Sequence, residues 1–271
     1  MAKKSLGQNF LVDEGVVARI VREVAPRADE TVVEIGAGRG ALTARLLDHA
    51  GHLVAVEFDR DLVPLLRERF GAWEHFKLVE ADALALDFCA AILPAQKARV
   101  VANLPYNIST AILQRLFEQR RCLTEMILML QREVVERVTA APGTGERGYL
   151  SVLTEAYCEA RPLFDVRPEA FRPVPKVWST VVRLSVRESA VADVADEAWL
   201  WRTVSAGFAQ RRKTIFNNLR HVPPPLLPRV EAAGGAGALL ERAGVEPHRR
   251  AETLTLTEWV ALARALESDA R

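Results

Sequence analysis

The sequence lacks several features that would place it in other classes of protein. It contains no apolar run of about 18 residues, which argues against a membrane-spanning helix. The opening MAKKSLGQNF has lysines but no apolar stretch after them, so it does not resemble a secretory signal. Its three cysteines, Cys89, Cys122 and Cys158, are widely spaced and form no CxxC pair. A reducing, cytosolic setting fits this usage.

Clustered metal ligands are also scarce. The only close pair of histidines is His49 and His52, and no cysteine lies near them to complete a zinc site. A pair of surface histidines explains this spacing more simply. The sequence therefore predicts no metal centre.

Charge is balanced overall but unevenly distributed. The 271 residues are 49% apolar and 26% charged, which favours a folded chain with a full core, and the net charge is +1. The segment 199–250, however, carries nine basic and three acidic residues and so has a net charge of +6. This asymmetry predicts a polyanionic partner for the C-terminal part of the chain.

The first two thirds of the sequence alternate between short apolar runs and amphipathic stretches. This pattern predicts a doubly wound α/β domain with a largely parallel sheet. The predicted strands are 31–38, 52–59, 75–82, 98–106 and 123–131, and the predicted helices are 13–25, 40–50, 61–70, 108–119 and 132–140. Residues 188–196 have the composition of a linker, and the pattern is helical from Glu197 onward. We therefore expect two domains, 1–190 and a small all-helical 191–271.

A glycine-rich turn follows the first of these strands. Gly36, Gly38 and Gly40 have G-x-G-x-G spacing, which differs from the G-x-G-x-x-G of dinucleotide folds. Glu57 ends the next strand and could accept both hydroxyls of a ribose, and Asp82 ends a third strand and could accept from an adenine amine. An adenosine without phosphate fits this set, which predicts S-adenosylmethionine. Alternatively, Glu57 and Asp82 are caps of the following helices.

The corner 103-NLPY-106 follows another strand. Asn103 and the carbonyl of Leu104 could accept the N–H groups of a base amine, Pro105 restricts Leu104 to an extended conformation, and Tyr106 could stack on the base. This corner therefore predicts methyl transfer to an exposed nucleobase amine, which must be unpaired or flipped out. The alternative is a purely structural Asn-x-Pro turn.

Five separate strings together resemble one family. They are 6-LGQNFLVD-13, 34-EIGAGRGALT-43, 103-NLPYNIST-110, 171-FRPVPKVWSTVVRL-184 and 208-FAQRRKTIFNNL-219. They resemble the ribosomal RNA adenine dimethyltransferases, and most closely the bacterial branch that acts on small-subunit (16S) RNA. The resemblance implies a Rossmann-like methyltransferase domain that binds S-adenosylmethionine, followed by a helical domain that binds RNA. It also implies dimethylation of N6 of two adjacent adenosines in the 3′-terminal hairpin loop, late in subunit assembly.

The resemblance also implies roles for single residues. Asn9 and Leu11 would contact the cofactor, together with Gly36, Gly38, Glu57, Asp82 and Asn103. Phe171 would stack on the face of the target base that Tyr106 leaves open. One departure from the family is a short N-terminal lead, in which only Ala2, Lys3 and Lys4 precede the Ser-Leu-Gly before QNFL, so RNA contacts there are expected to be weaker.

The substrate side of the prediction depends on cations. Arg211, Arg212 and Lys213 form a dense basic patch suited to RNA phosphates, although a charge run is often only a solvated helix face. We expect the partner to be 16S rRNA within the small (30S) subunit, and the protein to be a cytoplasmic monomer with no membrane association.

Three other functions remain open at this point. The chain could belong to the related branch that methylates large-subunit (23S) RNA and confers macrolide resistance. It could be a non-catalytic RNA-binding assembly factor, although Glu57, Asp82 and Asn103 are all present. It could also methylate a small molecule, which would leave the basic segment unexplained.

Overall fold

The computed structural model describes residues 7–189 and 197–267. The short N-terminal lead and most of the predicted linker lie outside these residues. The chain divides into two compact units, one formed by 1–135 with 159–186 and the other by 136–158 with 187–271. The predicted boundary at residue 190 falls in the second unit and outside the described residues, so the assignment of a function to each domain stays a prediction.

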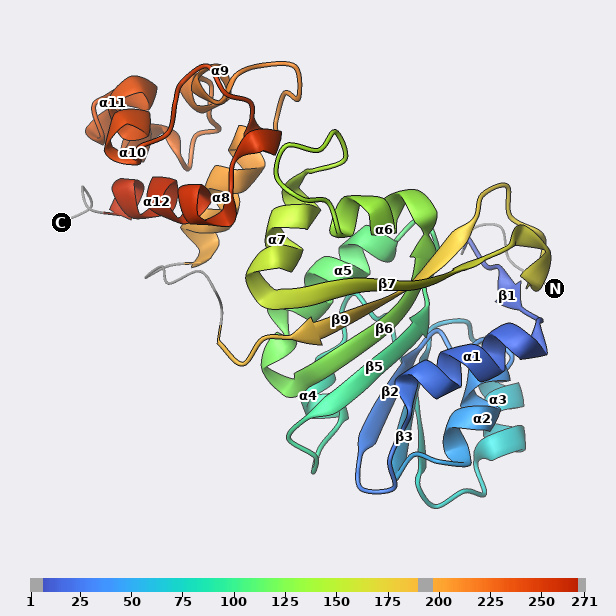
Figure 1. Cartoon of the computed structure of the whole chain (residues 1–271). Coiled ribbons are helices and arrows are strands. Elements are labelled where there is room, and N and C mark those ends of the chain that lie inside the picture. Colours follow the sequence, from blue (N-terminus) through green and yellow to red (C-terminus); the bar gives the residue numbers. More distant parts are fainter. Residues whose placement is uncertain (1–6, 190–196, 268–271) are drawn as a thin grey trace. The chain divides into compact units, whose positions relative to one another are not determined.

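The first unit is built on a seven-stranded sheet with the strand order β4-β3-β2-β5-β6-β9-β7 (Figure 1). Strands β2 to β6 pair in parallel, and β9 pairs antiparallel with β6. The strands are β2 (Thr31–Ile35), β3 (His52–Glu57), β4 (Phe76–Glu80), β5 (Ala98–Asn103), β6 (Leu123–Gln131), β7 (Cys158–Val166) and β9 (Ser179–Val186). Two-residue strands β1 (Phe10–Leu11) and β8 (Phe171–Arg172) form a separate ladder.

Helices cover both faces of this sheet. The strand order runs outward from β2 to β4 and then reverses to β5 on the other side of β2, and right-handed crossovers therefore place the two sets of helices on opposite faces. Figure 1 shows α1, α2 and α3 on one face and α4 and α5 on the other. Their bounds are α1 (Glu14–Val24), α2 (Ala41–Leu47), α3 (Val63–Phe70), α4 (Phe88–Ala91) and α5 (Ser109–Glu118). The predicted doubly wound α/β class is confirmed.

Local sequence explains why these elements form. Asp13 caps α1 by accepting from the backbone N–H of Val16 at 3.0 Å, as its position predicted. The apolar stripe of the same helix is buried, and each such side chain contributes roughly 1.5–3 kcal/mol. All five residues of β2 are buried, as expected for a central parallel strand covered on both faces. The edge strand β7 was not predicted, because exposed charged residues such as Glu159 and Arg161 interrupt its apolar pattern.

A disulfide joins Cys89 in α4 to Cys122, which ends the short helix η2 (Arg120–Cys122). The two cysteines are 33 residues apart, and their Cα atoms are 5.5 Å apart. This pair was not predicted, because the two cysteines have neither a CxxC motif nor a short spacing. Cys158 is a free, buried thiol.

The second unit is helical. Helix α6 (Arg132–Val138) leads from the first unit into it, and its other α-helices are α7 (Tyr149–Tyr157), α8 (Glu197–Gly207), α9 (Ile215–Arg220), α10 (Leu227–Ala232), α11 (Gly235–Arg242) and α12 (Leu256–Glu267). Trp259 is fully buried at its centre. Arg147 is also buried, and its guanidinium donates to a carboxylate oxygen of Glu155 at 2.7 Å and to the carbonyl oxygen of Leu254 at 3.3 Å. The Tyr157 hydroxyl donates to Glu197 at 2.6 Å.

Candidate active site

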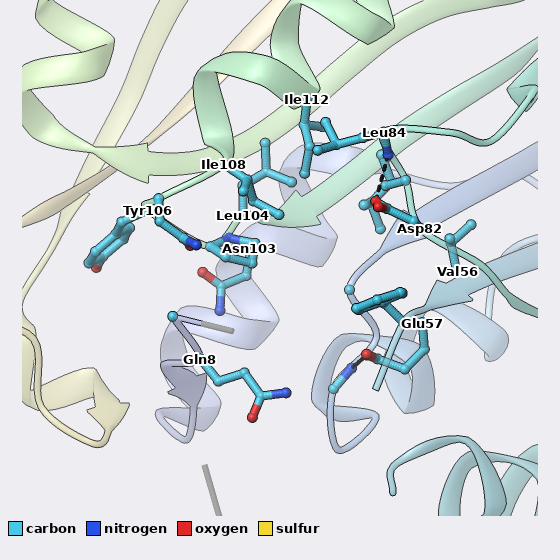
Figure 2. A pocket seen from close by; sticks show the side chains of 18 of the residues that line it. Gln8, Val56, Glu57, Asp82, Leu84, Asn103, Leu104, Tyr106, Ile108 and Ile112 are labelled. Atoms are coloured by element: carbon cyan, nitrogen blue, oxygen red, sulfur yellow. Dashed lines mark hydrogen bonds between the residues drawn. The ribbon is translucent and has the colours of Figure 1, made fainter. Parts of the chain in front are cut away.

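A cavity of 270 Å³ opens at the carboxyl ends of β2, β3 and β5 (Figure 2). This edge of a doubly wound sheet is where ligands bind, because the strand order reverses there and leaves a crevice. The cavity is lined by Gly7, Gln8, Asn9, Phe10, Ile35, Gly36, Gly38, Val56, Glu57, Phe58, Ala81, Asp82, Ala83, Leu84, Asn103, Leu104, Pro105, Tyr106, Asn107, Ile108 and Ile112. Nearly all the residues predicted to bind cofactor or base in the first unit therefore meet at one place.

The glycine turn forms one wall. Gly36 and Gly38 have φ values of +73° and +60°, a region that residues with a side chain rarely adopt. A Cβ on Gly38 would lie 3.3 Å from the ring of Phe10, while a Cβ on Gly36 would have no neighbour nearer than 4.0 Å and would point into open space beside Asn103. The turn therefore lets the backbone approach a ligand closely.

Glu57 is the last residue of β3, as predicted, and is buried. One of its carboxylate oxygens accepts from the backbone N–H of Gly38 and the other from that of Asp59, both at 2.8 Å. These bonds join the acid to the glycine turn. Each carboxylate oxygen can accept more than one hydrogen bond, so Glu57 can still accept from a ligand.

The prediction that Asp82 ends its strand is wrong, because β4 ends at Glu80 and Asp82 follows it by two residues. One of its carboxylate oxygens accepts from the backbone N–H of Leu84 at 2.9 Å. This local bond gives the carboxylate a fixed direction beside the cavity (Figure 2). The alternative role of Asp82 as a helix cap would account for this one bond. It would not account for the position of Asp82 at the cavity wall.

The QNFL string lies across the carboxyl ends of the strands. The side-chain amide of Gln8 donates to Asp59 at 2.8 Å, and that of Asn103 donates to the carbonyl oxygen of Asn9 at 3.0 Å. Asn9 lines the cavity, whereas Leu11 is buried and lines a neighbouring groove that shares Gly36, Gly38 and Asn103 with it. Contact of Leu11 with the cofactor therefore stays a prediction.

All four residues of the NLPY corner line the cavity. Asn103 is the last residue of β5, as predicted, and the backbone N–H of Leu104 donates to the carbonyl oxygen of Met129 at 3.2 Å. The Tyr106 hydroxyl lies 2.7 Å from Oγ of Ser179, at the start of β9. Burial raises the pKa of Tyr106 above its usual range, although the bond to Ser179 opposes this, so the hydroxyl is neutral at physiological pH.

Phe171 lies elsewhere. Its side chain is fully buried in the core, it pairs with Leu11 in the β1–β8 ladder, and it is not among the residues that line the cavity. Stacking of Phe171 on a target base therefore stays a prediction, and it requires this side chain to become accessible.

The predicted basic patch belongs to the second unit. Arg211, Arg212 and Lys213 are exposed in the loop between α8 and α9, not on a helix face. The guanidinium of Arg211 donates to the carbonyl oxygen of Gly145. The loop presents the three cations to solvent, which is compatible with phosphate contacts that the structure does not test.

Some lining residues were missed by sequence reasoning. Phe58, Ile108 and Ile112 give the cavity apolar walls, and Gln8 fixes the segment that borders it. Phe58 is 57% exposed, which is unusual for an aromatic residue that follows a buried strand. Its place directly after Glu57 was the one available signal.

The sheet, the glycine turn and the acid at the end of β3 define the class of protein, a Rossmann-like S-adenosylmethionine-dependent methyltransferase. A dimethyladenosine transferase from Plasmodium falciparum has the same fold, with a TM-score of 0.81 over 96% of this chain and 98% of that one at 21% identity. The 23S rRNA methyltransferase ErmE has a TM-score of 0.68 and 28% identity, over 96% of this chain and all of the other.

Sequence comparison narrows this class to one family. The model of the family described as ribosomal RNA adenine dimethylase matches residues 1–262, and the chain belongs to this family. A Ribosomal RNA small subunit methyltransferase A from Hahella chejuensis is 44% identical over 97% of this chain and 92% of its own length. The protein of the same name from Pseudomonas aeruginosa is 43% identical over 98% and 94%. Of the helices in the described ranges, none has the length and apolar character needed to span a membrane.

Proposed function

We propose that this protein dimethylates N6 of two adjacent adenosines in the 3′-terminal hairpin loop of 16S rRNA, using S-adenosylmethionine, within the small ribosomal subunit. The observation that carries the proposal is the cavity itself, where Glu57 and Asp82 lie beside the Asn103–Tyr106 corner. Relatives at 41–44% identity are named small-subunit methyltransferases, whereas the 23S enzyme ErmE is 28% identical. This difference favours the small-subunit substrate.

The residues present fit S-adenosylmethionine. The described residues that line the cavity include two carboxylates, Glu57 and Asp82, and no lysine, arginine or histidine. Such a lining suits a ligand that carries positive charge and no phosphate. The open space beside Gly36 admits a ligand against the backbone. When bound, S-adenosylmethionine supplies a methyl group on a sulfonium; Glu57 would hold its ribose and Asp82 its adenine amine.

The chain itself would contribute alignment of the target amine, which can be worth ~7–11 kcal/mol. Because the Asn103 amide nitrogen donates to Asn9, its oxygen remains as the acceptor for a target N–H. The Leu104 carbonyl, directed by Pro105, would accept the second N–H. The Tyr106 ring, held by Ser179, would stack on the base, a contact worth ~1–3 kcal/mol.

On the substrate side, we propose that Arg211, Arg212 and Lys213 contact phosphates of the small-subunit RNA, and that the protein acts as a cytoplasmic monomer. The exposure of these three basic side chains in one loop supports the phosphate contacts. A non-catalytic assembly factor is a weaker proposal, because it would not need acids and an amide gathered at a cavity. A small-molecule methyltransferase would leave this basic loop without a role.

The test is transfer of labelled methyl groups from S-adenosylmethionine to undermethylated small subunits, with large-subunit RNA in parallel, followed by nucleoside analysis. We expect dimethyladenosine from small subunits alone. Label on large-subunit RNA would instead assign the protein to the branch that methylates 23S RNA and confers macrolide resistance. If neither small subunits nor large-subunit RNA are labelled while the cofactor still binds, a non-catalytic RNA-binding assembly factor would be favoured.

A further inference from the structure

An exposed tryptophan lies beside the candidate active site. Trp178 immediately precedes β9, and the next residue, Ser179, holds the Tyr106 hydroxyl at 2.7 Å. The pairing of Ser179 with Gln131 at the end of β6, and the bond from the backbone N–H of Arg132 to the carbonyl oxygen of Trp178, fix this position. Since β6 is parallel to β5, Trp178 lies at the same edge of the sheet as Asn103.

The side chain of Trp178 is not used by the core. It is 43% exposed, and two nearby apolar side chains of the same loop, Val174 and Val177, are 53% and 40% exposed. An exposed apolar group of this kind on a loop at a ligand-binding edge indicates a contact surface. Residues 171–184 carry part of the family resemblance, but no role was predicted for the tryptophan.

Several basic residues lie close to Trp178 along the chain. Arg172 ends β8 and Lys176 lies in the loop that follows, and both are exposed. The guanidinium of Arg172 donates to the carbonyl oxygens of Glu169 and Phe171, and the backbone N–H of Arg132 donates to the carbonyl oxygen of Trp178. Arg167 and Trp178 line one groove of 770 Å³ beside the N-terminus of α1. An aromatic ring among basic side chains is the arrangement that binds unpaired nucleotides, because bases stack on the ring and cations meet the phosphates.

Three acids, Asp13, Asp165 and Glu169, also line the groove. Asp13 caps α1 at 3.0 Å, and Asp165 accepts from the Thr180 hydroxyl at 2.6 Å and lies 3.8 Å from the guanidinium of Arg132. Their charge makes the groove floor a poor phosphate site. The phosphates are instead expected at Arg172 and Lys176 on the loop, with a base over Trp178.

We propose that Trp178 stacks on an unpaired nucleotide next to the target adenosine in the substrate RNA, and so sets the register of the RNA strand at the active site. This inference rests on the proposed function, since it requires an RNA strand that delivers its base to the Asn103 corner. A protein partner or a small apolar ligand in the groove would leave RNA affinity independent of Trp178.

The test compares Trp178→Ala and Trp178→Phe with Trp73→Ala in steady-state methylation of undermethylated small subunits. Trp73 is a matched control, because it is also 43% exposed but precedes β4, at the opposite edge of the sheet. We expect Trp178→Ala to raise KM for subunits by roughly five- to 100-fold, as for the loss of one stacked base, with little change in kcat. Trp178→Phe should recover most of this loss, because it keeps an aromatic face.

Calorimetric titration with S-adenosylmethionine and thermal unfolding would verify that each variant is folded. A KM for Trp178→Ala equal to that of Trp73→Ala would overturn the inference, and so would an equal loss in Trp178→Phe. A wild-type protein that methylates no RNA would instead contradict the proposed function. The two failures are therefore distinguishable.

Discussion

At the scale of single residues, the proposed function gives Asn103 two roles. Its amide nitrogen donates to the carbonyl oxygen of Asn9, in the segment that borders the cavity, and its oxygen is left for the target amine. The side-chain amide of Gln8 donates to Asp59 and so holds the same segment in place. It has no proposed contact with the target amine. Under the proposed function, we therefore expect Asn103 to align the substrate and Gln8 to help retain the cofactor.

We predict that Asn103→Ala lowers kcat at least about 100-fold, because the target amine loses an acceptor that aligns it, while the dissociation constant for S-adenosylmethionine changes by only a few-fold. Gln8→Ala should show the reverse, with weaker cofactor binding and a small change in kcat. Single-turnover methylation and calorimetry measure the two quantities. If Asn103→Ala lowers kcat and the affinity for S-adenosylmethionine to the same extent, Asn103 does not have the proposed catalytic role.

Glu34 is a buried carboxyl group whose ionisation makes the stability of the fold depend on pH. It lies in β2 at 2% exposure, and the Thr43 hydroxyl donates to its carboxylate at 2.6 Å. Burial raises its pKa to about 8, against the smaller opposing effect of the Thr43 hydrogen bond. Because the folded pKa is raised, the folded state holds the proton more tightly. The stabilisation from this group is complete below the unfolded pKa of about 4.5 and is lost as pH rises toward 8.

We predict that Glu34→Gln removes this pH dependence, because the amide has the same shape and does not ionise. The free energy of unfolding of the wild type should fall by roughly 1.4 kcal/mol per pH unit relative to the variant across this window. Urea unfolding at several pH values measures the slope, with Glu80→Gln, an exposed carboxylate on edge strand β4, as the control. Parallel curves for wild type and Glu34→Gln would contradict the assignment.

At the scale of elements, the two-residue ladder of β1 and β8 connects the two ends of the first unit. Phe10 pairs with Arg172 and Leu11 with Phe171, and the backbone N–H of Val12 donates to Ala170 at 2.8 Å. This short ladder therefore holds the QNFL segment against the loop that leads to Trp178. Leu11 is 7% exposed, whereas its neighbour Val12 is 48% exposed.

We predict that Leu11→Ala costs about 2–4 kcal/mol of stability, as for other buried leucines, and also weakens cofactor binding because the ladder loosens. Val12→Ala should change both by little, since its side chain is half in solvent. Urea unfolding and calorimetric titration with S-adenosylmethionine provide the measurements. A Leu11→Ala variant that is destabilised but binds cofactor normally would show that the ladder is only structural.

Most of the central elements could be predicted, because hydrophobic periodicity and strand-end residues are local signals. Asn103 and Glu57 were placed correctly at the ends of their strands. The sequence could not reveal β1, β8 or the Cys89–Cys122 disulfide, since each depends on segments far apart in the chain. The burial of Phe171 was missed for the same reason, because it is set by its pairing with Leu11.

At the scale of the whole molecule, an excess of positive charge lies in the segment 199–250 of the second unit, whose net charge is +6. The loop with Arg211, Arg212 and Lys213 is exposed there. If it contacts phosphates, each cation should release about one counterion on binding RNA, and affinity should depend steeply on salt.

We predict that Arg211→Ala with Arg212→Ala weakens binding to small subunits and reduces the slope of log K against log salt by roughly 1.5. The matched control is Arg22→Ala with Arg67→Ala, which removes the same charge from exposed positions on α1 and α3. Filter binding at several salt concentrations measures the slopes. The same slope for both double variants would assign the effect to net charge alone.

The route of the chain between its two units has a consequence for exchanging them among relatives. The second unit takes 136–158 from the middle of the sequence as well as the C-terminal part. Arg147 and Tyr157 belong to that insert, and their partners Leu254 and Glu197 come from the C-terminal part. A hybrid joined only near residue 190 would therefore combine mismatched halves of one helical core. Recombination of the helical unit therefore requires three crossover points, one on each side of the insert and one before residue 187, so that both segments come from the same parent.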